Sequence, residues 1–352
     1  MPILDREDPE EMRRFRAFVS SVRDAHFIQD HRWEQVQGHL KAEYVTVEEN
    51  GEIIAATAAY IRPVGLGMSL IYCKRGPVTR ERNARAVLRL IEEMKPLIQK
   101  YRAFAIRFDP NWEDTDQRIS DFTEHGFRIR GRGYTKRVLV MSRRTMSFPI
   151  EGKTMDELMA GFKSRTRRDI NKSLRSGLQI EEGFTPEHLD TFMEILEITC
   201  KRDAISHMSR EFFRRIGEHF GRDEARLYLV KKDETYLSAA VAMNYGGRMY
   251  YYHSGSTNEL RNLYPNARMQ HQLLSWAVDS HCHTYDMGGI VAQDPKDGLY
   301  LFKSGYCNGY PMDEYIGELD YPIHLFIYRL FIALFDAMQH VRMWIFERKN
   351  HK

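Results

Sequence analysis

Along the first part of the chain, apolar residues recur either every three to four residues, as in helices, or at every second residue, as in strands. Runs rich in β-branched and aromatic residues flank an Asn50-Gly51 turn, which predicts a hairpin. Helices are expected at 9–23, 83–101 and 119–125, and strands at 42–47, 52–61, 68–73 and 104–108. Because helices and strands alternate, we expect an α/β or α+β unit with a mixed sheet.

A second series of elements begins near Met146 and follows a similar order. Thr154 and Glu157 form a capping box, and Thr185-Pro186 has the cap and the proline typical of a helix start. The later elements are expected as strands at 225–231, 236–245 and 248–254, a helix at 267–280 and a strand into Tyr285. The shared order indicates a duplicated fold, although no residue-level repeat is visible.

The stretch from Tyr285 to Lys303 combines unusual features. A short strand ends in a Gly288-Gly289 turn, and a polar loop is followed by an aromatic run that ends at Phe302 and Lys303. Paired glycines allow a tight turn or a close approach to a ligand. By itself the pattern favours an ordinary loop between two strands, with Lys303 as an exposed lysine at a strand end.

Composition narrows the class of protein. A chain of 352 residues with 43% hydrophobic and 12% aromatic residues is long enough for two globular domains. The four cysteines are far apart without C-x-x-C spacing, which argues against a zinc ribbon or a disulfide framework and suits a reducing cytosol. No signal peptide or membrane-spanning run is visible. We therefore expect a soluble, cytoplasmic protein without a metal or another cofactor.

One basic helix and one long apolar helix are predicted. The net charge is only +3, so a nucleic-acid partner would need a local basic surface. Arg165, Arg168, Lys172 and Arg175 share one face of a predicted helix, which is either such a surface or a solvated helix face. Residues 324–346 form a long helix with a wide apolar face, which would pack on the protein's own sheet or touch a membrane surface.

Short motifs recur in a characteristic order over nearly the whole chain. Each is weak alone, but their order and spacing are specific. They are Phe27-Ile28-Gln29 followed by Trp33, Lys74-Arg75-Gly76-Pro77-Val78, Arg107-Phe108-Asp109-Pro110, Leu174-Arg175-Ser176-Gly177-Leu178, Tyr251-Tyr252-His253-Ser254-Gly255-Ser256, Tyr264-Pro265-Asn266-Ala267, Tyr285-Asp286-Met287-Gly288-Gly289-Ile290, Phe302-Lys303 and Glu314-Tyr315-Ile316-Gly317-Glu318. With these motifs the chain resembles the FemABX family of aminoacyltransferases, in the compact form without a helical arm.

The resemblance implies a fold and an activity. The fold would be two acetyltransferase-like (GNAT-like) domains, at 1–145 with 315–352 and at 146–314. Such enzymes take an amino acid from aminoacyl-tRNA and attach it to the side-chain amine of the stem peptide of a peptidoglycan precursor. The precursor is lipid II or UDP-MurNAc-pentapeptide, and the protein would act as a monomer. Peripheral contact with the membrane through the C-terminal helix is a further expectation.

The resemblance also implies roles for particular residues. Asp109 would position the acceptor amine or relay its proton, and its alternative is the residue of an Asp-Pro turn. Lys303 would stabilise the oxyanion of the tetrahedral intermediate, with Phe302 beside the tRNA acceptor end. The basic residues Arg165, Arg168, Lys172 and Arg175 would bind tRNA.

Residues for binding the precursor are also expected, with two departures from the family pattern. Tyr251 and His253 would face one groove, while Tyr252 alternates inward. After Trp33 no basic residue appears before Lys41, and His207-Met208 lacks the arginine that a compact relative would offer. Arg210 is expected to replace that arginine. The full set expected to bind substrate is Phe302, Tyr251, His253, Arg75, Arg210, Gly288 and Gly289.

Three other functions are open from the sequence. An acetyl-CoA-dependent GNAT enzyme would need a Gly-rich turn at a helix start, whereas the helix here starts with Tyr264-Pro265-Asn266-Ala267. A tRNA-dependent N-acyltransferase could act on a different acceptor, such as a protein, a lipid or a small molecule. A non-enzymatic RNA-binding protein would account for the basic helix but would leave Asp109 and Lys303 without a role.

Overall fold

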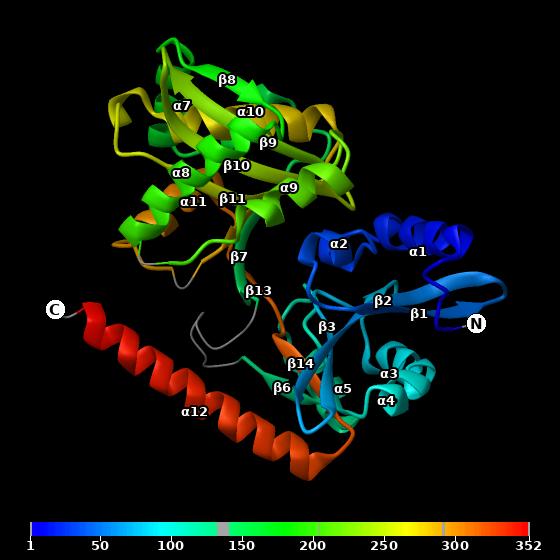
Figure 1. Cartoon of the computed structure of the whole chain (residues 1–352). Helices are drawn as coiled ribbons and strands as arrows, with labels where there is room; N and C mark the ends of the chain where they lie inside the picture. The colour runs from blue at the N-terminus through cyan, green and yellow to red at the C-terminus, as the bar shows by residue number, and fades with distance from the viewer. Residues whose placement is uncertain (1, 132–140, 204, 291–292, 351–352) are drawn as a thin grey trace. The chain divides into compact units, whose positions relative to one another are not determined.

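The computed structural model describes residues 2–131, 141–203, 205–290 and 293–350, with side chains as far as residue 338. The chain divides into two compact units (Figure 1). The first unit comprises Met1–Glu34, Gly38–Arg143 and Glu314–Lys352, and the second comprises Arg144–Asp313 with Gln35–Gln37. The boundaries expected after residues 145 and 314 lie two residues and one residue beyond the observed ones.

The first unit is built on a seven-stranded mixed sheet with the order β1-β2-β3-β5-β14-β6, and β4 pairs with β2. Strands β3 and β5 are parallel, and β14 lies between β5 and β6, antiparallel to both. The last part of the chain thus completes the sheet that the first part begins. The strands are β1 (Ala42–Glu49), β2 (Glu52–Gly65), β3 (Met68–Cys73), β4 (Val78–Thr79), β5 (Ala103–Phe108), β6 (Arg128–Arg130) and β14 (Glu318–Pro322).

Helices of the first unit pack on this sheet. Asn83 caps α3 by accepting a hydrogen bond from Ala86 N, and the apolar face of α3 packs on β1 and β2. The single helix expected at 83–101 is two helices, because Pro96 lies in the first turn of the second one. The helices are α1 (Pro9–Ser21), α3 (Ala84–Glu93), α4 (Lys95–Lys100), α5 (Asp116–Glu124) and α12 (Leu325–Asn350), with a 3₁₀ turn at Phe27–Gln29. The short helix α2 (Trp33–Gln37) begins in the first unit, and its last three residues are assigned to the second.

The second unit has its own seven-stranded sheet, with the order β13-β7-β12-β11-β10-β9-β8. Strands β11 and β12 are parallel, whereas the pairs β8–β9, β9–β10 and β10–β11 are antiparallel. The strands are β7 (Arg144–Pro149), β8 (Gln179–Glu182), β9 (Ala225–Lys232), β10 (Thr235–Tyr245), β11 (Arg248–Ser256), β12 (Thr284–Gly289) and β13 (Asp313–Glu314).

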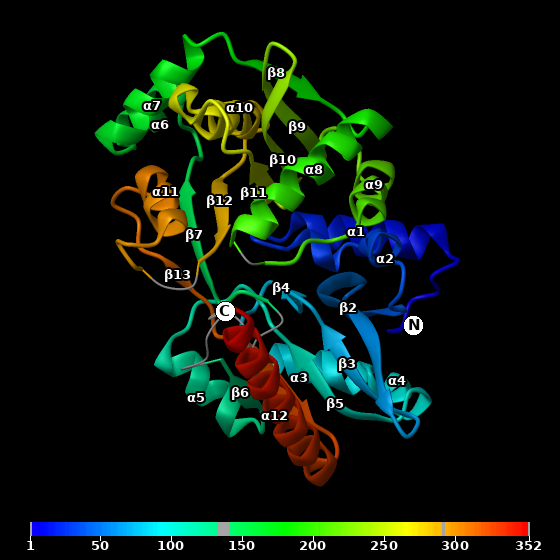
Figure 2. The same cartoon turned by 60° about the vertical axis from the view of Figure 1, so that its left-hand side comes forward.

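Helices cover both faces of the second sheet. Figure 2 shows α10 and α8 on opposite sides of the strands, with α9 beside α8. The core on the α10 face includes Tyr228 and Ala240 from the sheet and Leu273 and Trp276 from α10. The capping box expected at Thr154 and Glu157 is present. The helices are α6 (Met155–Gly161), α7 (Ser164–Leu174), α8 (Pro186–Asp203), α9 (Arg210–His219), α10 (Pro265–Asp279) and α11 (Gly298–Tyr306), with a 3₁₀ turn at Arg261–Leu263.

The aromatic run before Lys303 is helical, not the strand suggested by its sequence. Asp297 caps α11, because its side chain accepts a hydrogen bond from Tyr300 N at 2.9 Å. Phe302 and Tyr306 are then one turn apart, and both join the core of the second unit. A short apolar run cannot be assigned to helix or strand by periodicity alone, which explains the error.

The long C-terminal helix α12 packs on the first sheet through one face. Tyr328 is buried with Leu70 and Phe104, and its Oη donates to Asp320 Oδ2 at 2.8 Å. The opposite face leaves Phe326 and Leu330 exposed. Packing on the protein's own sheet, as expected from the sequence, therefore occupies only part of the helix. Within the described residues, none of the helices combines the length and the apolar character needed to span a bilayer.

Candidate active site

Asp109 directly follows Phe108 at the end of β5, and only 3% of its surface is exposed. Its Oδ2 accepts a hydrogen bond from Tyr72 Oη at 2.6 Å, and its Oδ1 accepts one from the backbone N–H of Arg75. Tyr72 reaches Asp109 because β3 and β5 are parallel neighbours, with Tyr72 opposite Arg107. Burial raises the pKa of the Asp109 carboxyl above its usual value, although Arg75 and Tyr72 act in the opposite direction.

The turn that carries Arg75 is held by a buried glutamine from an earlier motif. Gln29 Nε2 donates to the carbonyl oxygen of Lys74 at 2.6 Å. A Cβ on Gly76 would lie 2.7 Å from the Gln29 carboxamide, so only glycine fits there. Arg75 has a φ of +54°, which brings its N–H onto Asp109. The motifs that contain Gln29 and Lys74, 45 residues apart, are therefore hydrogen-bonded to each other beside the carboxylate of Asp109.

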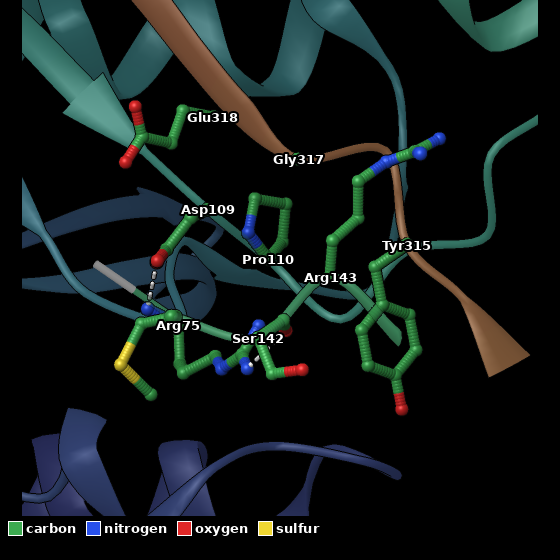
Figure 3. A pocket seen from close by; sticks show the side chains of 9 residues that line it. Arg75, Asp109, Pro110, Ser142, Arg143, Tyr315, Gly317 and Glu318 are labelled. Carbon is green, nitrogen blue, oxygen red and sulfur yellow. Dashed lines mark hydrogen bonds between the residues drawn. The ribbon is translucent and has the colours of Figure 1, made fainter. Parts of the chain in front are cut away.

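A cavity of about 10 Å³ adjoins Asp109 (Figure 3). Arg75 closes one side of it, where its Nη2 donates to the carbonyl oxygen of Ser142 at 2.8 Å. Its guanidinium also lies 5.8 Å from the ring centre of Tyr315. The volume is close to the minimum that holds one water molecule. The cavity is lined by Arg75, Asp109, Pro110, Met141, Ser142, Arg143, Tyr315, Gly317 and Glu318.

Glu318, the first residue of β14, is a second buried carboxylate on this cavity and is 2% exposed. Its Oε2 forms an ion pair with Arg107 Nη1 at 2.9 Å, while its Oε1 is buried without a hydrogen-bond partner. Burial raises the pKa of Glu318 to about 7. Sequence reasoning missed this residue as a site candidate. Its motif is visible, but only the insertion of β14 beside β5 brings it next to Asp109.

Lys303 lies in the last turn of α11, and only 5% of its surface is exposed. Its Nζ donates to the carbonyl oxygen of Gly289 at 2.9 Å. The alternative of an exposed lysine at a strand end is therefore wrong. Phe302, the residue before it, is half-buried and packs edge-on against Tyr306 with ring centres 5.4 Å apart. The second unit thus holds a buried ammonium group at the end of β12.

The end of β12 is shaped by a glycine with a positive φ. Gly288 has a φ of +82°, and its N–H donates to Asp286 Oδ1 at 2.7 Å. The other oxygen of Asp286 pairs with Arg248 Nη1 at 2.9 Å. A Cβ at Gly288 would lie 3.5 Å from Lys303 Nζ, which is ordinary contact. The backbone conformation, more than space, is therefore what requires glycine here.

Helix α11 packs closely on the basic helix α7. A Cβ on Gly305 would lie 2.2 Å from Thr166 Oγ1, so the two helices can approach only with glycine at this position. The backbone N–H of Lys163 donates to the Gly305 carbonyl oxygen at 3.0 Å, and the Lys163 ammonium donates to Ser304 Oγ at 3.3 Å. The start of α7 is therefore fixed to the helix that carries Lys303.

The four basic residues expected to bind tRNA all have exposed side chains on or just after α7. Arg165 and Arg168 are 81% and 66% exposed, and the ammonium of Lys172 lies 5.2 Å from the ring centre of Tyr264. The buried side of α7 is formed by Ile170 and Ser173, whereas Leu174 is exposed. Their binding of tRNA stays a prediction.

Tyr251 and His253 do not face one groove. A β-bulge in β11 pairs Val241 with His253 but Ala242 with Tyr251, so Tyr252 is an extra residue. As a result Tyr251 packs with the core on the α10 face, while His253 contacts aromatic rings of α9 on the other face. Tyr252 lies beside His253, with ring centres 4.4 Å apart, instead of pointing to the opposite side.

Arg210 is the first residue of α9, and its side chain forms hydrogen bonds within the second unit. Its Nε donates to Asp190 Oδ1 at 2.5 Å, and its Nη2 donates to the carbonyl oxygen of Pro186 at 3.0 Å. His253 is buried, which lowers its pKa to about 4, with a further lowering effect from His207. His253 is therefore neutral at physiological pH. The side chains of Arg210 and Asp190 are both partly exposed, and binding of the precursor by Arg210 stays a prediction.

The described part of the chain contains possible metal ligands and all four cysteines. No group of three or more His, Cys, Asp or Glu side chains there could hold a metal ion. The four cysteines are buried as free thiols, and burial raises the pKa of Cys73 to about 12. Such a thiol is unreactive at neutral pH.

Comparison with known proteins connects this geometry to a family. The FemAB family profile matches residues 11–233 and 226–335, which is most of the chain. The chain belongs to the FemAB family. This FemAB protein is 28% identical over 329 residues to the UDP-N-acetylmuramoylpentapeptide-lysine N(6)-alanyltransferase of Weissella viridescens, covering 91% of this chain and 96% of that relative. It is 27% identical over 392 residues to the Lipid II:glycine glycyltransferase of Staphylococcus haemolyticus, covering 89% and 92%.

The fold of the FemAB protein is also that of a solved relative. The crystal structure of FemX superposes with a TM-score of 0.83 at 25% identity and covers 94% of this chain and 99% of that one. The family resemblance and the α/β fold of paired acetyltransferase-like domains are therefore confirmed. Among the expected site residues, the first unit brings Arg75 and Asp109 together, and the second brings together Gly288, Gly289 and Lys303.

Proposed function

We propose that this FemAB protein moves an amino acid from aminoacyl-tRNA to the side-chain amine of the stem peptide of a peptidoglycan precursor. The observation that carries the proposal is the burial of Lys303 at the end of β12, where its ammonium is held beside a glycine turn. A buried lysine with a fixed position has the chemistry that acyl transfer needs. Relatives named as alanyl- and glycyltransferases that align over about nine-tenths of the chain support the reaction class.

Lys303 acts on the ester of the aminoacyl-tRNA in this proposal. The acceptor nitrogen attacks the ester carbonyl carbon, a C–N bond forms, and the carbonyl oxygen becomes an oxyanion. The Lys303 ammonium stabilises that charge, most strongly in a site with little water. When the intermediate collapses, the C–O bond to the tRNA ribose breaks and the ribose oxygen takes a proton. Phe302, half-buried beside Lys303, offers a ring for stacking at the acceptor end.

The first unit holds the acceptor. A lysine-like amine has a pKa of about 10.4 in water, so the acceptor arrives as an ammonium ion and must lose a proton before it attacks. Asp109 and the cavity beside it provide buried carboxylates for that ammonium. The relatives are named for a nucleotide-linked and a lipid-linked acceptor.

A transfer assay tests the proposal. The protein is given tRNA charged with radiolabelled Gly, Ala or Ser, together with UDP-MurNAc-pentapeptide or lipid II. We expect label on one of the acceptors in a base-stable linkage. Transfer from acetyl-CoA instead would place the protein among GNAT enzymes, and label on a protein or lipid amine would indicate another acceptor. No transfer to either precursor would contradict the proposal.

We extend the proposal to tRNA binding by the exposed basic side chains of α7. Charge reversal in the double variant Arg165→Glu/Arg168→Glu should weaken tRNA binding and lower the slope of log K against log salt by about 0.7 to 0.9 per lost phosphate contact. A matched control is Arg13→Glu/Arg14→Glu on α1, which changes the net charge equally. Binding would be measured as a function of salt. An unchanged slope for the α7 variant would make α7 a solvated face.

We also propose a cytoplasmic location, where aminoacyl-tRNA is found, with peripheral contact of α12 to the membrane surface. The exposed face of α12 offers Phe326 (80% exposed), Leu330 (53%), Leu334 (58%) and Met338 (59%), one turn apart. Arg329 is exposed on the same side, and the only acidic residue in 325–338, Asp336, pairs with Arg130 at 2.6 Å. An apolar stripe with a cation suits an anionic bilayer.

Vesicle sedimentation tests this contact. The unmodified protein should bind phosphatidylglycerol vesicles more tightly than phosphatidylcholine vesicles, and Leu330→Ser/Leu334→Ser should lose most of that binding. Leu174→Ser/Leu260→Ser, which changes two exposed leucines of the second unit, is the control. Equal sedimentation of both variants with the anionic vesicles would refute the assignment to α12.

A further inference from the structure

The two carboxylates of the cavity beside β5, Asp109 and Glu318, differ in how many of their oxygens have a hydrogen-bond partner. Both oxygens of Asp109 accept hydrogen bonds from fixed donors, Tyr72 Oη and the N–H of Arg75. Glu318 uses only Oε2, in its ion pair with Arg107. Its Oε1 is buried and has no hydrogen-bond partner. The open acceptor on this cavity is therefore Glu318, not the aspartate that the sequence pointed to.

A buried oxygen without a hydrogen-bond partner lowers the stability of the folded protein, and a bound ligand that donates a hydrogen bond removes that cost. The cavity of about 10 Å³ has room for one group the size of a water molecule, and an ammonium group is of that size. Figure 3 shows the carboxylates of Asp109 and Glu318 on the same side of the cavity, carried by different strands. The site therefore suits the end of an alkyl ammonium chain.

We propose that Glu318 is the carboxylate that receives the acceptor ammonium and takes its proton, and that Asp109 is a positioning residue that fixes Tyr72 and the Arg75 turn. The inference rests on the proposed function and names a further residue for its acceptor site. In this arrangement Glu318 Oε1 binds the acceptor ammonium, which is the substrate group that must lose a proton in the proposed reaction.

Charges of both signs surround Glu318. Arg75 and Arg143 also line its cavity, and Arg143 is paired with Asp114 and Glu314. Arg107 faces it from β5 and Arg130 from β6, while Asp320 on β14 and Asp109 at the end of β5 add negative charge. Arg107 is shared, since Asp320 accepts from its Nε at 2.6 Å and its Nη2 at 2.7 Å. Arg130 is in turn paired with Asp336 of α12.

The contacts of these charged groups leave one oxygen of Glu318 unused. Arg107 pairs with Asp320 and with Glu318 Oε2, and Asp109 faces Arg75 and Lys74, whereas Glu318 Oε1 is buried without a hydrogen-bond partner. Burial raises the pKa of Glu318 to about 7, so the group is ionised above that pH and protonated below it. It can therefore bind an ammonium at neutral pH and hold its proton after transfer.

The proton balance of the step is complete. The ammonium N–H bond breaks toward Glu318 Oε1, and the free amine attacks the ester carbon. The amide C–N bond forms, the ester C–O bond breaks, and the ribose oxygen takes the second proton that the nitrogen loses. Protonated Glu318 then releases its proton to solvent. The net reaction turns one ammonium and one ester into one amide, one alcohol and one proton.

The test compares Glu318→Gln with the unmodified protein in the transfer assay. The amide keeps the size of the side chain and an oxygen for Arg107, but it cannot take the proton. We expect kcat/KM for the precursor to fall by about 100-fold, the lower end of the range for general base catalysis, with the KM for aminoacyl-tRNA unchanged. In the unmodified protein, kcat/KM should rise with pH through about 7 and level off above it. The variant should lose that inflection.

A binding experiment separates this role from a structural one. Calorimetry is done with two stem peptides that differ only at the third position, lysine or norleucine. Glu318→Gln should weaken binding of the lysine peptide to the level of the norleucine peptide and leave norleucine binding unchanged. A variant within threefold of normal turnover, or equal weakening of both peptides, would overturn the inference. Absence of transfer by the unmodified protein would instead remove the proposed function.

Asp320→Asn is the matched control. Asp320 is fully buried and binds the same Arg107, but it does not line the cavity. If Glu318 acted only by holding Arg107, Asp320→Asn would lower kcat/KM in the same way and would also abolish the inflection. We expect Asp320→Asn to keep an inflection, moved below pH 7 because a negative charge that raises the pKa of Glu318 is lost, and to keep the preference for the lysine peptide. The thermal unfolding of Asp320→Asn is measured alongside that of Glu318→Gln.

Discussion

The two units each bury a charged group at the end of a strand, but they hold it in different ways. In the first unit, Asp109 and Glu318 belong to a network that joins three strands of the sheet and residues from both ends of the chain. In the second, Lys303 is held beside the end of β12 by a helix only 14 residues further along the chain. One site is built by the whole fold, and the other is built locally.

This difference predicts where activity and stability are coupled. The ion pairs of Arg107 with Asp320 and Glu318 are almost completely buried, so breaking them leaves charges without partners. A change there should cost both stability and turnover. Lys303 donates to Gly289, 14 residues earlier in the chain, and the adjacent Ser304 accepts a hydrogen bond from Lys163 at the start of α7. A change there should cost turnover far more than stability.

The largest expected effect is on turnover in the second unit. Lys303→Ala removes the cation from the oxyanion and should lower kcat by about 100- to 1000-fold. Its thermal unfolding should stay close to that of the unmodified protein, because only one side chain of a local site is lost. Lys296→Ala, an exposed lysine in the loop before α11, is the control and should be normal. Near-normal kcat for Lys303→Ala would remove the lysine from the mechanism.

The next effect is on the stability of the first unit. Arg107→Leu leaves Asp320 and Glu318 buried without their cation and should lower the free energy of unfolding by about 3–5 kcal/mol. Arg128→Leu, an exposed arginine opposite Asp320 on the neighbouring β6, should change it by about 0.5 kcal/mol or less. Urea unfolding of both variants measures the difference. Similar values for the two would show that the first site is not built on its ion pairs.

The smallest effect tests the glycine turn of the second unit. Gly288→Ala places a side chain on a backbone with a φ of +82° and should cost about 1–2 kcal/mol of unfolding free energy. Gly298→Ala, at the first residue of α11 with open space around it, should lie within about 1 kcal/mol of the unmodified protein. Equal effects in urea unfolding would mean that the turn is not strained by a side chain.

Local patterns in the sequence predicted most elements of both sheets, because hydrophobic period, turns and caps act within a few residues. The failures are also local in origin. Pro96 splits one expected helix, and the Asp297 cap converts an aromatic run into α11. The bulge at Tyr252 turns His253 to the opposite face from Tyr251. In each case a single residue decided between two structures that the apolar pattern allowed equally.

The site itself was only half predictable. Asp109 and Lys303 follow from the resemblance to the family, and the basic residues of α7 follow from helical spacing. Glu318 does not, because its place beside Asp109 depends on β14 entering the sheet between β5 and β6. Strand order over a separation of 209 residues, from Asp109 to Glu318, is a property of the whole fold. Burial of Lys303 could not be predicted because it depends on 298–306 forming the helix α11 and packing in the second unit.

The central claim is that an amine of the stem peptide takes the amino acid from tRNA. The most direct measurement is a single-turnover transfer from radiolabelled aminoacyl-tRNA to the precursor that proved active, made with either lysine or norleucine at the third position. The account predicts base-stable label on the lysine precursor alone, lost in Lys303→Ala. Base-stable label on the norleucine precursor, or none on either, would contradict it.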